Sequence, residues 1–187
     1  IYGIEGRGGG SAAVKAGGKG DVTDANTVWN GNDSAGFATP LVVDGRIYFL
    51  SRSVANCINA KDGSEVYKER LPGASSQPDR GGRPGGDGGF GQGGFGQGGF
   101  GGRGGFGGRG GRGGGRSSDY ASPVAADGKI YFLKSNGSTI VINASDKFEV
   151  LATNELTTER EVFSGTPAIS DGQIFIRSDK HLYCISQ

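Results

Sequence analysis

Three stretches of the chain align with one another without gaps: TPLVVDGRIYFLS at residues 39–51, SPVAADGKIYFLK at 122–134 and TPAISDGQIFIRS at 166–178. Each begins with a hydroxyl residue and Pro, has Asp-Gly four and five positions after that Pro, and has Ile at the seventh. Self-similarity at a fixed period is the signature of a repeat architecture. The fold therefore depends on what one copy can form and on how far apart the copies lie.

One copy contains the signals of a β-hairpin. Asp-Gly is a dipeptide that accepts the positive φ angles of a two-residue hairpin turn, so residues 40–43 and 46–51 are expected to be antiparallel strands. The second of them holds a continuous apolar run from Ile47 to Leu50, which is typical of a strand covered on both faces. Further strands are expected at 54–60 and 65–71, so one repeat predicts a four-stranded sheet.

The spacing of the copies indicates a propeller with an insert. Pro123 and Pro167 lie 44 residues apart, whereas Pro40 and Pro123 lie 83 apart. Between the latter two, residues 81–116 include 23 Gly in 36 positions. Without this tract the period is about 44 throughout, within the ~40–45 residues of a propeller blade.

We therefore predict an all-β chain that is a β-propeller fragment of four-stranded antiparallel blades. Residues 1–30 are expected to form strands two to four of one blade, 39–72 and 120–156 two complete blades, and 163–187 strands one to three of another. Residues 73–116 are expected to be a flexible, disordered insert. The total of 14 expected strands falls short of the ~16 in a four-bladed ring, which suggests the C-terminal part of a larger propeller.

Charge and hydropathy exclude several function classes. The net charge is +1, but residues 80–116 hold six Arg and one Asp, so the remainder is net negative. The folded part is therefore expected to bind neither nucleic acid nor an anionic membrane, and no apolar run is long enough to span a bilayer. The chain has no Met and opens inside a predicted strand, so any signal peptide or lipid anchor is expected to lie upstream.

The repeats resemble the PQQ-like β-propeller family, whose blades open with Pro, Asp-Gly and Ile-Tyr and close with an Ala-x-Asp-x-x-Gly-x-x-x-Trp type of motif. Here residues 59–67, NAKDGSEVY, match the closing motif with Tyr67 where Trp is usual, whereas 143–151, NASDKFEVL, lack both the Gly and the aromatic residue. The structural motif residues predicted from these repeats are Pro40, Asp44, Gly45, Asp62, Gly63, Pro123, Asp127, Gly128, Pro167, Asp171, Gly172 and Trp29.

The resemblance implies two possible functions. In the non-catalytic branch, similar to the BamB-type outer-membrane assembly factor, the blades dock other proteins. In the quinoprotein dehydrogenases they bind pyrroloquinoline quinone (PQQ) and Ca²⁺, with an adjacent Cys pair, a Trp under the cofactor and an Asp base. Cys57 and Cys184 are far apart and Trp29 lies in a blade-closing strand. We therefore predict an extracytoplasmic, non-enzymatic scaffold for a protein or glycan partner and for the missing upstream blades, with no catalytic, cofactor-binding or metal-binding residue.

The remaining candidate residues have structural interpretations. Cys57 and Cys184 each follow the Pro of their repeat by 17 positions, so an intervening blade keeps them too far apart for a disulfide, and both are expected to be small buried side chains. His181 is expected to be a surface or hydrogen-bonded residue. Asp44, Asp127 and Asp171 are expected to form turns and not a calcium site.

The Gly-rich tract has two interpretations, a solvated loop and a specific binding segment. Phe90, Phe95, Phe100 and Phe106 recur every five or six residues, and Arg103, Arg109, Arg112 and Arg116 are interleaved with the last of them or follow it. Arg and aromatic groups on a flexible backbone resemble an RGG segment, which stacks on bases and contacts phosphates. We expect a solvated loop, since the closure entropy of a long loop grows slowly with its length. RNA binding or self-association through this tract is the alternative.

Overall fold

The computed structural model describes residues 1–6, 9–73 and 120–186. The predicted insert at 73–116 lies outside these residues except for Gly73, so its prediction stays open.

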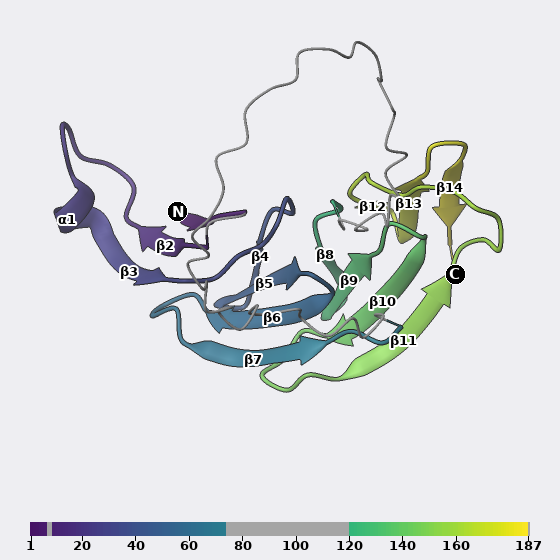
Figure 1. Ribbon diagram of the computed structural model, residues 1–187, viewed down its shortest axis with the longest axis horizontal. Helices are drawn as coiled ribbons and strands as arrows, with labels where there is room; N and C mark the ends of the chain where they lie inside the picture. The colour runs from purple at the N-terminus through teal and green to yellow at the C-terminus, as the bar shows by residue number, and fades with distance from the viewer. Residues whose placement is uncertain (7–8, 74–119, 187) are drawn as a thin grey trace, which may run out of the picture. The chain divides into compact units, whose positions relative to one another are not determined.

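The described residues form four antiparallel sheets, here called blades 1 to 4 (Figure 1). Blade 1 consists of β1 (Tyr2–Ile4), β2 (Ser11–Val14) and β3 (Thr27–Gly31), and blade 2 of β4 (Leu41–Val43), β5 (Arg46–Ser51), β6 (Val54–Asn59) and β7 (Glu65–Arg70). Blade 3 consists of β8 (Val124–Ala126), β9 (Lys129–Leu133), β10 (Ser138–Asn143) and β11 (Val150–Glu155), and blade 4 of β12 (Ala168–Ser170), β13 (Gln173–Arg177) and β14 (Leu182–Ile185).

Each blade is a meander in which strands adjacent in sequence are paired. Blades 2 and 3 have four strands, and blades 1 and 4 have three. The predicted all-β propeller fragment, with two of its blades incomplete, is therefore confirmed. The one helix in the described part of the chain is α1 (Thr23–Asn26), which the sequence pattern did not predict. A single turn of four residues is too short to show the periodicity by which a helix is recognised.

The hairpins between the first two strands of blades 2 to 4 turn on the Asp-Gly pairs. In blade 2, Asp44 and Gly45 have φ angles of 46° and 73°. The equivalent angles are 49° and 69° at Asp127-Gly128 and 50° and 73° at Asp171-Gly172. Positive φ at both central residues defines a type I′ turn, whose twist matches that of the flanking strands. Pro40, Pro123 and Pro167 directly precede β4, β8 or β12, where a missing N–H costs no ladder hydrogen bond.

The core consists of three apolar clusters, each between two consecutive blades. Trp29 of blade 1 packs with Phe49 of blade 2, Tyr48 of blade 2 with Phe132 of blade 3, and Leu133 of blade 3 with Ile176 of blade 4. Because β5 contributes to both the first and the second cluster, its four central residues are all buried. The apolar run in the repeat is thus explained by stacking, and stability comes from contacts between neighbouring blades.

One burial prediction is wrong. Cys57 is fully buried, but Cys184, at the equivalent position of blade 4, is exposed, and both are free thiols. Blade 3 packs against the face of blade 2 that carries Cys57. No described residue packs in the same way on the face of blade 4 that carries Cys184, so the same repeat position has a different environment.

Candidate functional site at the connector end of the blades

Because neighbouring strands run in opposite directions, each blade has two ends. The end with the Asp-Gly turns and with the turns at 60–64 and 144–149 is here called the turn end. The opposite end, here called the connector end, carries the segments that lead from blade to blade and the turns at 52–53, 134–137 and 178–181. The three motif prolines precede the first strands of their blades at the connector end, whereas the other predicted motif residues lie at the turn end, opposite the candidate functional residues.

The motif residues at the turn end hold blade 1 against blade 2. The indole Nε1–H of Trp29 donates to the carbonyl oxygen of Ala60 over 3.1 Å. The Trp29 ring covers Gly63 so closely that a Cβ there would lie 2.7 Å from a ring carbon. Asp62 accepts hydrogen bonds from the hydroxyl and the backbone N–H of Ser64, and these bonds lower the pKa of the Asp62 carboxyl. These contacts give the motif residues a structural role.

Blades 2 and 3 use different residues for the same contact. Tyr67 replaces the usual Trp, and its ring packs edge-on against Phe148 with centroids 5.5 Å apart. Phe148 follows Lys147, where the closing motif has lost its Gly. An ion pair between Arg46 and Asp146 adds a second link across this blade boundary. The contact between Tyr67 and Phe148 thus lies at the blade position where blades 1 and 2 have the contact between Trp29 and Gly63.

At the connector end, the hydroxyl residue before each motif Pro joins consecutive blades. The backbone N–H of Thr39 donates to Ser122 Oγ over 2.8 Å, and the N–H of Ser122 donates to Thr166 Oγ1 over 3.0 Å. The partners are 83 and 44 residues apart, which are the spacings of the repeat itself. The aligned sequences show this residue type, but its role depends on the blades being side by side.

Two exposed aromatic side chains stack on each other beside this hydrogen-bond chain. The ring centroids of Phe37 and Tyr120 are 5.1 Å apart, with ring planes inclined by 28°. The side chains are 54% and 49% exposed, although each is followed directly by a buried alanine. Both lie three positions before a motif Pro, so the sequence carries a signal for this pair that was not among its predicted site residues, an aromatic residue at the same position of two repeats.

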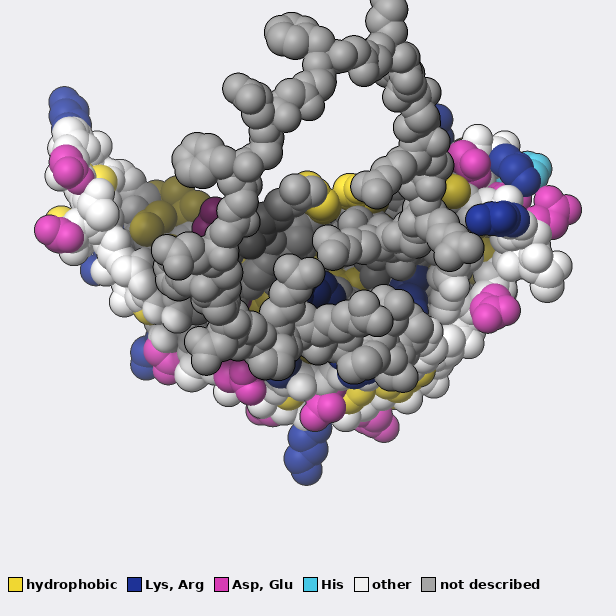
Figure 2. All heavy atoms as spheres, in the orientation of Figure 1, with side chains coloured by type: hydrophobic (Ala, Val, Ile, Leu, Met, Phe, Trp, Pro, Cys, Tyr) yellow, Lys and Arg dark blue, Asp and Glu magenta, His cyan; other side chains and the backbone are white. Residues whose placement is uncertain are grey.

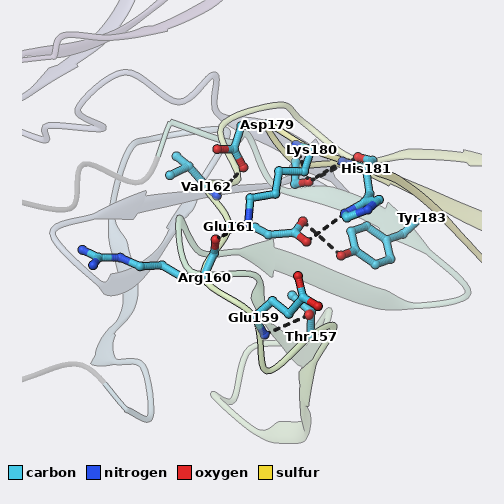
Figure 3. Close-up of polar contacts among 10 residues, drawn as sticks. Thr157, Glu159, Arg160, Glu161, Val162, Asp179, Lys180, His181 and Tyr183 are labelled. Atoms are coloured by element: carbon cyan, nitrogen blue, oxygen red, sulfur yellow. Dashed lines mark hydrogen bonds and ion pairs between the residues drawn. The ribbon is translucent and has the colours of Figure 1, made fainter.

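A buried carboxylate lies on the connector end where blades 3 and 4 meet (Figure 3). The Glu161 side chain is only 1% exposed. Its Oε1 lies 2.8 Å from Nδ1 of His181, and its Oε2 accepts a hydrogen bond from the Tyr183 hydroxyl over 3.0 Å. Hydrogen bonding from Ser178, and then from His181 and Tyr183, lowers the pKa of the Glu161 carboxyl despite its burial. We call these four residues the Glu161 cluster.

The turn between β13 and β14 positions the Glu161 cluster. Ser178 Oγ accepts the backbone N–H groups of Lys180 and His181. Asp179 and Val162 exchange two hydrogen bonds, of 2.9 and 3.0 Å, which join the turn to the connector between blades 3 and 4. The His181 side chain remains 58% exposed, with side chains of both charge signs nearby (Figure 2). The prediction of a surface or hydrogen-bonded histidine is confirmed.

The Glu161 carboxylate gives a testable dependence of stability on pH. Its folded-state pKa is lowered from the ordinary value of 4.5, so ionised Glu161 stabilises the fold above that value. This stabilisation is lost as the pH falls through the folded-state pKa. We expect wild type to melt at a higher temperature than Glu161→Gln near pH 7, and the difference to shrink below about pH 5. Thermal melts from pH 7 to pH 3 measure this, and a pH-independent difference would contradict it.

The comparisons with known proteins identify the fold. No family model matches the sequence, and no curated protein sequence matches it. Among solved structures, BamB from Moraxella catarrhalis has a TM-score of 0.58 and 11% identity, over 96% of this chain and 41% of that one. The quinohemoprotein alcohol dehydrogenase ADHIIG from Pseudomonas putida HK5 has a TM-score of 0.46 and 16% identity, over 75% of this chain and 16% of that one. The chain thus spans 41% of the length of BamB and has the PQQ-like β-propeller fold.

Proposed function

We propose that the chain is part of a non-enzymatic PQQ-like β-propeller that binds a protein partner at its connector end. The observation that carries the proposal is the exposed Phe37–Tyr120 stack. Aromatic side chains are enriched at protein interfaces and among the residues that dominate binding energy. An exposed stacked pair on two neighbouring blades therefore supports a protein-binding surface.

The surroundings of the pair favour binding because they fix it before a partner arrives. Ala38 and Ala121 are buried, and the hydrogen bond from Thr39 to Ser122 joins the two connectors two residues after the rings. Little side-chain or backbone freedom then remains to be lost on association, and such preorganisation increases affinity. We infer a partner that covers the rings with an apolar side chain. The Glu161 cluster offers a polar contact on the same end, through the exposed His181 ring.

Alanine substitutions in the pair test this proposal. Once a partner has been purified with the chain from its source, Phe37→Ala and Tyr120→Ala are each expected to weaken its binding at least about tenfold, which corresponds to a loss of about 1.4 kcal/mol and lies in the range of hot-spot truncations. Isothermal titration calorimetry measures the Kd. Leu151→Ala is the control, since Leu151 is a comparably exposed apolar side chain on β11. Equal affinities for all three variants would refute the proposed site. Purification of a glycan, and not a protein, as the partner would refute the proposed class of ligand.

The dehydrogenase function is the alternative, and the described residues do not fit its cofactors. Within residues 1–6, 9–73 and 120–186, no three His, Cys, Asp or Glu side chains lie together as metal ligands would. Trp29 covers Gly63 at the turn end, and Cys57 is buried between blades 2 and 3. The positions of Trp29 and Cys57 in contacts between blades support the scaffold, which we favour.

We further propose an extracytoplasmic location, which the resemblance of the repeats to the PQQ-like family supports. In the described part of the chain, no helix has the length and apolar character that crossing a membrane requires. Fractionation of the source cells with an antibody against the chain tests the location, and recovery with the cytoplasmic fraction would exclude it.

A further inference from the structure

A row of three polar side chains lies inside the boundary between blades 2 and 3. Tyr48 of β5, Cys57 of β6 and Tyr67 of β7 lie directly opposite one another across the three strands. All three belong to the cluster between the two blades, with exposed fractions of 0%, 0% and 9%. The other buried members of that cluster are aliphatic, apart from Phe132. The row therefore puts two hydroxyls and a thiol into an otherwise apolar interior.

The two phenol hydroxyls are enclosed but unpartnered. Neither the Tyr48 nor the Tyr67 hydroxyl has a hydrogen-bond partner among the residues that the structure describes. A buried hydroxyl without a partner costs free energy, and most such groups in proteins are bonded to protein or to ordered water. The third enclosed, unpartnered atom in the described ranges is Thr139 Oγ1. It lies on the opposite face of β10 from Ile140, which faces blade 2, so the two tyrosines form a site of their own.

We propose that one water molecule binds between the hydroxyls of Tyr48 and Tyr67, over the thiol of Cys57. A phenol hydroxyl both donates and accepts hydrogen bonds, and a thiol is a weak donor. A single water can therefore satisfy both hydroxyls, accepting from one and donating to the other. Buried waters typically make about three hydrogen bonds, and the thiol supplies the third. The water links β5 to β7 inside the blade boundary, so the proposal does not depend on partner binding at the connector end.

The short side chain in the middle of the row supports this position. Neighbouring strands lie about 4.8 Å apart, so the two tyrosines stand about 10 Å apart at the backbone, with only a thiol between them. Blade 1 has an equivalent row of Tyr2, Ala13 and Trp29. Its two rings approach each other across the alanine, with centroids 6.4 Å apart. In blade 2 the Tyr67 ring packs against Phe148 of blade 3, which favours a small molecule over the thiol.

The chemistry of the row favours a neutral ligand over an ion. Burial raises the pKa of the Cys57 thiol to about 11 and that of the Tyr48 hydroxyl to about 12, and it raises the pKa of Tyr67 as well. All three groups are therefore protonated at neutral pH, whereas a metal cation binds the deprotonated forms. Arg46, two residues before Tyr48 on β5, is already paired with Asp146. An anion would thus be buried without a counter-charge, which is costly, so water fits best.

Phenylalanine variants test the proposal by the sign of their effect on stability. Tyr48→Phe and Tyr67→Phe each remove one hydroxyl and no carbon atom. Each is expected to lower the folding equilibrium constant of the full chain about fivefold, as the loss of one hydrogen bond does. Removal of a hydroxyl that has no partner at all would instead raise that constant. Urea denaturation measures it. Tyr131→Phe is the control and should change the constant less than about twofold, because Tyr131 is the repeat equivalent in blade 3 and its hydroxyl is not among the enclosed, unpartnered atoms.

The double variant and a crystal structure complete the test. The chain with both Tyr48→Phe and Tyr67→Phe is expected to lose less stability than the two single losses combined, because removal of either hydroxyl already loosens the shared water. A crystal structure of the wild-type chain that shows ordered waters is expected to have one within hydrogen-bond distance of both hydroxyls. A single variant as stable as the wild type, or more stable, overturns the proposal. So do strictly additive losses, or a crystal structure with no water between the two hydroxyls.

Discussion

Gly63→Ala is expected to lower the free energy of unfolding by about 3 kcal/mol, from two separate costs. The φ angle of Gly63 is 73°, and the left-handed region costs a residue with a Cβ about 1–2 kcal/mol. The new Cβ would also lie 2.7 Å and 2.8 Å from two carbons of the Trp29 ring. Relieving that overlap must move a buried indole whose N–H is bonded to Ala60, and overpacking of this kind costs about 1–3 kcal/mol.

Gly45→Ala separates these two costs. Gly45 has the same φ angle of 73°, but a Cβ there would meet nothing within 4 Å. This control should therefore lose only about 1–2 kcal/mol. Urea denaturation of the two variants and the wild type measures the difference. Equal losses of unfolding free energy would mean that the Trp29 ring moves away from the new Cβ without destabilising the fold. The contact between blades 1 and 2 would then not depend on the position of that ring.

Phe163→Ala is expected to be the most destabilising of the substitutions considered, with a loss of about 3–5 kcal/mol, as for other buried Phe truncations. The Phe163 side chain is fully buried and belongs to the cluster between Leu133 of blade 3 and Ile176 of blade 4. Its ring lies directly over Gly137. Truncation would leave a cavity between two blades that rely on each other for burial.

Val162→Ala is the matched control, because Val162 is the neighbouring residue on the same connector and its side chain is mostly exposed. We expect it to change stability by no more than about 0.5 kcal/mol. Phe163→Ala should also loosen the connector that carries Glu161 and so remove the pH-dependent stabilisation by that carboxylate. Denaturation curves at pH 7 and pH 4 measure both effects. A Phe163→Ala variant as stable as Val162→Ala would contradict the role given to this cluster.

The blades and their hairpins could be predicted because their signals are local. An Asp-Gly turn and the apolar run of Ile47 to Leu50 depend on residues within one repeat, and the 44-residue spacing of Pro123 and Pro167 reflects the length of one blade. The exposure of Cys184 could not be predicted in the same way. Its environment depends on what covers the next face, and a repeat pattern gives equivalent positions without giving each of them a neighbour.

The sequence by itself determined the repeat, the blade as its unit and the residues at the turn end, since these follow from turn chemistry and strand periodicity over a few residues. Only the tertiary structure decided the connector end. Phe37 meets Tyr120 across a blade boundary, and Glu161 meets His181 from 20 residues away. These contacts depend on how each sheet is placed against the next. That placement is set by the packing of the whole interface between blades, which no local pattern in the chain records.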